Sequence, residues 1–196
     1  MDADDHPKPA SPAGEPVKKQ TAGVEMGKEI RTLVAGLMQE GERAAVVVGA
    51  ARLELALERL LTRVMQPHPG GSDNLFDPER PLGTFSAKIS LAFRLGLLDP
   101  KVESALQLIR RIRNEFAHSV GAASLSENSH ANRLRELTDR CRADSHYEIA
   151  IENMRKVPGT EKLQLFCAAL ILLIAAIESA GFRAKPYSIE RPAAFT

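Results

Sequence analysis

The stretch that decides the fold is LFCAALILLIAAI, residues Leu165–Ile177, near the end of the sequence. It is apolar throughout and contains no proline or glycine that would interrupt a helix. Because it is shorter than the ~20 apolar residues that cross a bilayer, it predicts a buried core helix and no membrane span. We expect this helix over 161–180, with Thr160 as its N-terminal cap. A helix that is apolar on nearly all sides needs other helices around it, so the stretch predicts a helical bundle.

The composition of the 196-residue chain also favours helices packed on one another. Hydrophobic residues make up 44% of the sequence, whereas aromatic residues make up only 5% and Trp is absent. Without a strand pattern or an internal repeat, the fold class is all-α, a single bundle of about six or seven helices. We expect the bundle over residues 24–182, after a disordered, proline-rich tail at 1–23 and before an extended tail at 183–196.

Apolar residues that recur at spacings of three and four predict the remaining helices. Asp99 and Pro100 are typical of a helix start, with a capping carboxylate followed by proline at the first helical position. Proline and glycine between residues 66 and 83 predict a loop. The expected helices before the core helix lie at 24–39, 42–65, 84–95 (starting at Thr84 or Ser86), 100–119, 131–142 and 146–157.

Charge and cysteine usage exclude several classes of protein. The formal net charge is +1, so binding of nucleic acid or a membrane surface is not strongly indicated. The arginine-rich stretch Arg133–Arg142 is interrupted by acidic residues, which favours a solvated helix face over a nucleic-acid patch. Cys141 and Cys167 have no spacing typical of zinc or redox motifs, and the N-terminus is not a secretory signal. We expect a cytoplasmic protein with no cofactor and no metal.

The stretch IRRIRNEFAHS, Ile109–Ser119, places candidate catalytic residues on one expected helix. Arg113, Asn114 and His118 stand there in R-N-x-x-x-H spacing. His118 has the residue type for an acid or base near neutral pH, and Arg113 has a planar fork that suits a phosphate. Asn114 lies one turn before His118 and is placed to orient its ring. Together these residue types suit RNA cleavage without a metal ion.

Helical geometry argues against a complete site on one helix. At ~100° per residue, Arg113 and His118 lie ~140° apart, whereas Asn114 lies ~40° from His118. Convergence on one phosphate therefore needs a second copy of the helix or a loosened helix end. In the structural alternative, Arg113 pairs with a carboxylate such as Glu54 or Glu58, and the other two side chains bind backbone carbonyls or a nearby loop. We favour this alternative and leave open whether the chain is an enzyme.

Three segments follow one another along the chain, namely AARLELALERLL (Ala50–Leu61), PLGTFSAKISLAFRLGLLD (Pro81–Asp99) and the motif helix Ile109–Ser119. In this order they resemble the mannitol operon repressor family, and the resemblance covers roughly residues 50–119. The resemblance implies an all-helical, cytoplasmic bacterial regulator of transcription, often oligomeric. It implies no recognisable DNA-reading helix, so we expect action through an unknown protein partner and a homodimer.

The R-N-x-x-x-H helix also resembles the HEPN superfamily. Active members of that superfamily are metal-independent ribonucleases and toxins that face two motifs across a dimer cleft. This second resemblance implies a HEPN-like bundle in which Arg113, Asn114 and His118 are the site residues. A regulatory protein that acts through protein contacts is therefore the favoured hypothesis, and a HEPN-type ribonuclease or toxin is the alternative.

Overall fold

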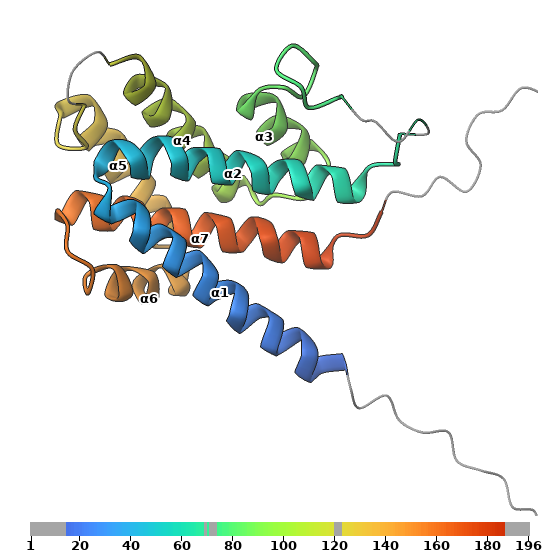
Figure 1. Ribbon diagram of the computed structural model, residues 1–196, viewed down its shortest axis with the longest axis horizontal. Helices are drawn as coiled ribbons and strands as arrows, with labels where there is room; N and C mark the ends of the chain where they lie inside the picture. Colours follow the sequence, from blue (N-terminus) through green and yellow to red (C-terminus); the bar gives the residue numbers. More distant parts are fainter. Residues whose placement is uncertain (1–14, 69, 71–73, 120–122, 187–196) are drawn as a thin grey trace, which may run out of the picture.

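The chain folds as a helical bundle arranged around one central helix (Figure 1). The computed structural model describes residues 15–68, 70, 74–119 and 123–186. Over these residues it contains seven α-helices and no strand, which confirms the predicted all-α class. The helices are α1 (Glu15–Gln39), α2 (Glu42–Val64), α3 (Phe85–Arg94), α4 (Pro100–His118), α5 (Asn128–Cys141), α6 (Ser145–Met154) and α7 (Glu161–Arg183).

The central helix is α7, which contains the predicted core stretch. It packs against α1, α2, α5 and α6, and side chains such as Phe166, Ala169 and Leu170 are fully buried. Thr160 caps it by accepting a hydrogen bond from the Leu163 amide, at 3.3 Å. By length and composition alone α7 is apolar enough to cross a membrane, but 56% of its most apolar window is buried in the bundle. Its surroundings are those of a core helix.

Gly49 of α2 lies against Leu170 of α7. A Cβ atom added there would lie 2.4 Å from Cδ1 of Leu170, well inside van der Waals contact. Glycine therefore allows the two long helices to pack with Leu170 seated directly over the α2 backbone.

Side-chain caps set the starts of the shorter helices. The Thr84 hydroxyl accepts from the Ala87 amide at 3.1 Å, which starts α3. Asp99 accepts from the Lys101 amide at 2.8 Å, and Pro100 is the first residue of α4, as predicted. Asp144 accepts from the His146 amide at 2.9 Å and starts α6. Local capping chemistry explains why these boundaries lie close to the predicted ones.

The start of α1 differs from the prediction. The helix begins at Glu15, so residues 15–23 are helical although the tail was expected to extend through residue 23. That segment has no apolar periodicity, but its Glu, Lys, Gln and Ala residues favour a helix and Pro16 lies in the tolerant first turn. Figure 1 shows α1 diverging from α7 toward its N-terminal end. The rest of the predicted tails, 1–14 and 187–196, lies outside the described residues.

Candidate functional site

The R-N-x-x-x-H motif occupies the last turns of α4. Ile109, Ile112 and Phe116 are fully buried, which confirms the predicted apolar stripe of this helix. Arg113 and Asn114 are half-buried at its edge, and His118 is exposed as the last residue of the helix. The local periodicity of α4 therefore separates the motif into a core-edge part and a solvent-facing part.

The structure joins two of the three motif residues. Arg113 donates from Nη1 to Oδ1 of Asn114 at 3.2 Å. His118 has no hydrogen bond or ion pair with any described residue. Four pockets on the described part of the chain are lined by other side chains. Because the contacts of this single chain do not bring His118 to the other two, the motif as a catalytic set remains a prediction.

The prediction that Arg113 pairs with Glu54 or Glu58 was wrong. Lys88 of α3 forms the ion pairs with both carboxylates. Its Nζ atom lies 3.1 Å from Glu54 Oε1 and 3.0 Å from Glu58 Oε2, and 5.9 Å from the ring centroid of Phe76. Lys88 belongs to the buried face of α3, which packs on α2, and is only 4% exposed. Two glutamates one helical turn apart repel each other, so their spacing was the signal for a cation from another element.

A second buried polar cluster joins α4 to α5. His130 is 2% exposed, with Nδ1 at 2.9 Å from the Ser124 carbonyl and Nε2 at 2.9 Å from the Glu115 carboxylate. Since a carbonyl oxygen only accepts, Nδ1 is the donor in the first contact. The ring packs on Phe116 with centroids 4.8 Å apart, and Arg133 also donates to Glu115. Glu115, inside the motif, therefore has a structural role, and sequence reasoning had no local signal for His130.

The arginine-rich helix α5 has little unpaired positive charge. Arg133 and Arg140 of α5 form ion pairs with Glu115 and Glu136, and Arg142, the residue that follows α5, pairs with Asp139. Arg135 is the arginine of α5 without an ion pair among the described residues. Paired arginines offer less attraction to a phosphate backbone, so the predicted solvated face describes α5 better than a nucleic-acid patch.

Neither cysteine is suited to nucleophilic chemistry. Burial raises the pKa of the Cys167 thiol to about 12. Burial, and then the negative charge of Asp144, raises the pKa of Cys141 to about 12 as well. The thiolate is the nucleophile and the metal ligand, so both side chains are inert near neutral pH. Over the described residues there is also no group of three or more His, Cys, Asp or Glu side chains placed to hold a metal ion.

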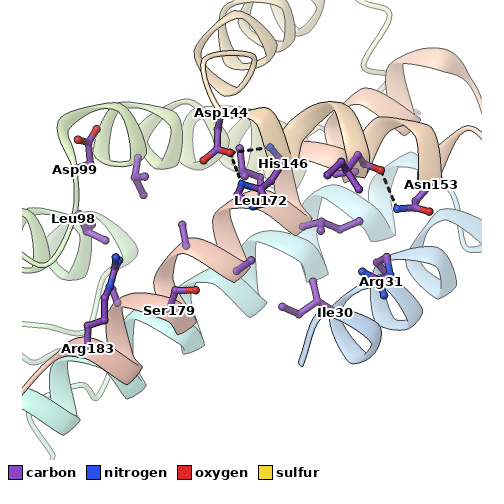
Figure 2. A pocket seen from close by; sticks show the side chains of 18 of the residues that line it. Ile30, Arg31, Leu98, Asp99, Asp144, His146, Asn153, Leu172, Ser179 and Arg183 are labelled. Atoms are coloured by element: carbon purple, nitrogen blue, oxygen red, sulfur yellow. Dashed lines mark hydrogen bonds and ion pairs between the residues drawn. The ribbon is translucent and has the colours of Figure 1, made fainter. Parts of the chain in front are cut away.

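A groove between α1, α6 and α7 has a volume of about 480 Å³ (Figure 2). We call it the α1–α6–α7 groove. Its floor is the apolar face of α7, and its walls are formed by α1, by α6 and by the segment that joins α3 to α4. Its lining includes Arg31 of α1, Ile149 and Asn153 of α6, and Ala175, Ala176 and Arg183 of α7.

The carboxylates that line this groove have hydrogen-bond partners, whereas two of its arginines have none among the described residues. Asp99 and Asp144 line it, but both carboxylates cap helices, and Asp144 also binds the His146 ring at 2.8 Å. The backbone hydrogen bond from His146, and then its side chain, lower the pKa of Asp144 and keep it ionised. Arg31 and Arg183 have no hydrogen bond or ion pair among the described residues. Figure 2 places these two arginines at opposite ends of the groove.

Comparison with known proteins supports the fold. No protein-family model and no curated protein sequence matches the chain. Among solved structures, the chain is similar to a chain of the MtlR–HPr complex from Escherichia coli, with a TM-score of 0.59 and 17% sequence identity. The match covers 76% of this chain and 98% of that chain. At this identity the likeness concerns the fold alone, and it supports the resemblance to mannitol operon repressors at that level.

Proposed function

We propose that this chain is a cytoplasmic regulatory protein of the mannitol operon repressor type that acts through contacts with another protein. The observation that carries the proposal is the match in fold to nearly the whole of a chain that was solved in complex with HPr. The near-neutral net charge and the ion pairs of Arg133, Arg140 and Arg142 also favour a protein partner over DNA. Exposed apolar side chains such as Phe93, Leu95 and Phe182 provide contact area.

Binding to an HPr-type protein is the direct test of this proposal. We expect saturable binding, one to one, when the purified chain is titrated with HPr from its own host in a calorimeter. Phe93→Ser and Phe182→Ser, each at an exposed position, then identify the surface involved, because only a residue in the interface weakens binding. Absence of binding at about 100 μM HPr, a concentration that detects even weak complexes, would contradict the proposal.

The proposal also predicts no direct reading of DNA. In an electrophoretic mobility assay we expect at most weak binding that does not depend on sequence. Tight, salt-sensitive and sequence-specific binding would contradict action through a protein partner alone.

A homodimer is the oligomeric state we propose for this protein. Light scattering after size exclusion should give twice the chain mass of 21.4 kDa, and a monomer mass at all concentrations would rule the dimer out.

The second candidate function is metal-independent RNA cleavage. What favours it is the exposure of His118 at the end of α4, one turn after the hydrogen-bonded pair of Arg113 and Asn114. If it holds, the chain cleaves RNA in the presence of EDTA, and His118→Ala and Arg113→Ala abolish cleavage with the fold intact. His68→Ala, at an exposed loop histidine, is the matched control and should retain activity. RNA left intact by the wild-type protein removes this candidate.

A further inference from the structure

We propose that the α1–α6–α7 groove binds an elongated amphipathic carboxylate, with the carboxylate on Arg31 and the apolar chain along α7. The proposal stands apart from the proposed function, because it concerns a small-molecule site and no protein partner. Three features of the groove support it, namely its unpaired arginine, its long apolar floor and its occupied carboxylates.

The head-group end of the groove is formed by α1 and α6. Arg31 is half-buried and has no partner among the described residues, and Asn153 lines the same groove. The guanidinium lies close to Gly27, since a Cβ added there would be 3.4 Å from Arg31 Nη1. The Asn153 amide donates one N–H to the Ile149 carbonyl at 2.9 Å, which orients the amide and leaves its second N–H available. A planar guanidinium and an amide donor that line one groove match a carboxylate.

The rest of the groove suits an apolar chain. The lining residues of α7 run from Ile171 to Arg183, which is about 18 Å at 1.5 Å per residue. Small side chains on that face, including Ala175 and Ala176, leave the volume of about 480 Å³ open, within the usual range of ligand sites. Ile149 on the wall is 57% exposed, so an apolar chain in the groove would cover it.

The unpaired charges that line the groove favour an anionic ligand. The carboxylates of Asp99 and Asp144 already accept hydrogen bonds from helix N-termini, and Asp144 also binds His146. Among the charged side chains that line the groove, Arg31 and Arg183 are the two without a partner in the described part of the chain, and they lie at its two ends. A cationic ligand would meet like charge at either end, and a neutral ligand would leave Arg31 without an ion pair.

Decanoate, used below its micelle concentration, is a suitable probe, with neutral decyl glucoside as the ligand control. In calorimetry we expect one decanoate per chain and at least about tenfold weaker binding of the glucoside, because a charge-assisted hydrogen bond is lost. Arg31→Gln should weaken decanoate binding by at least about tenfold for the same reason. Arg155→Gln, at an exposed arginine that follows α6 outside the groove, should leave it unchanged. Ala176→Leu, which fills the floor, should also weaken it.

Equal binding of decanoate and the glucoside would overturn the proposal, as would wild-type affinity of Arg31→Gln. Uptake of several decanoate molecules per chain would also overturn it, because that is the behaviour of a detergent on an apolar surface. Circular dichroism checks the helical content of each variant. If Ala176→Leu does not fold, Arg31→Gln still decides the outcome, since it changes a side chain at the groove wall and not in the core.

Discussion

Lys88 is a buried cation held between two carboxylates of α2. Its side chain is 5% exposed, while those of Glu54 and Glu58 are 20% and 35% exposed. Removal of the ammonium group leaves two like charges close together at the α2–α3 contact. The cluster therefore joins α3, and the loop that contains Phe76, to the long core helix α2.

We expect Lys88→Met to lower the free energy of unfolding by about 2–4 kcal/mol, because the uncompensated glutamates then repel each other. The measurement is the midpoint of urea unfolding followed by circular dichroism. Lys101→Met, at an exposed lysine of α4, is the control and should change stability by less than about 0.5 kcal/mol. A combined Lys88→Met, Glu54→Gln, Glu58→Gln variant should recover part of the loss. If it is no more stable than Lys88→Met, the charge argument is wrong.

The residues of the motif on α4 have different partners. Arg113 and Asn114 bind each other, Glu115 binds His130 and Arg133, and His118 alone faces solvent without a described partner. A residue pattern of the same spacing thus contains side chains with different roles, because the helix turns each one toward a different neighbour.

At the scale of elements, the contact between α2 and α7 depends on a glycine. Gly49 lies under Leu170 with no room for a Cβ, whereas Gly36 in α1 has nothing within 4 Å of the added atom. Both glycines are inside helices, where alanine is intrinsically favoured by about 1 kcal/mol. Replacement by alanine at Gly36 therefore changes helix propensity alone, whereas at Gly49 it also changes the packing against Leu170.

We expect Gly36→Ala to raise the free energy of unfolding by about 0.5–1 kcal/mol and Gly49→Ala to lower it by about 1 kcal/mol, since overpacking of a core outweighs propensity. Thermal and urea unfolding of the two variants, measured side by side, test the difference. A Gly49→Ala protein that is as stable as Gly36→Ala would mean that Leu170 moves without cost and that the helices are not closely packed there.

At the scale of the whole molecule, burial couples stability to alkaline pH. The pKa of Cys141 and of Cys167 is raised from 9.0 to about 12, and burial also raises the pKa of Tyr147. Above pH 9 the unfolded chain loses these protons while the folded chain keeps them. The unfolded state then binds fewer protons, so the free energy of unfolding falls as pH rises between 9 and 12.

We expect urea unfolding measured from about pH 8 to about pH 10.5 to show a lower free energy of unfolding above about pH 9, by up to about 1.4 kcal/mol per pH unit for each thiol. A Cys141→Ala, Cys167→Ala variant should show a shallower dependence, because alanine does not titrate. The same dependence in both proteins would show that the thiols do not contribute.

Much of the fold was predictable because its signals are local. The apolar run Leu165–Ile177 identified the core helix, and Thr84, Asp99 and Thr160 marked helix starts through capping chemistry that needs only neighbouring residues. The start of α1 was missed because residues 15–23 lack the apolar spacing on which the prediction relied. Helix propensity without periodicity is too weak a signal to place such a boundary.

The sequence by itself determined that this protein is a bundle of helices, which face of α4 is buried, and that α7 lies at its centre. Only the tertiary structure decided that Lys88 binds Glu54 and Glu58, that His130 joins Glu115, and that α1, α6 and α7 leave a groove between them. The physical reason is that periodicity along one helix defines its buried face, whereas contacts between side chains depend on which faces of separate helices meet and at what angle.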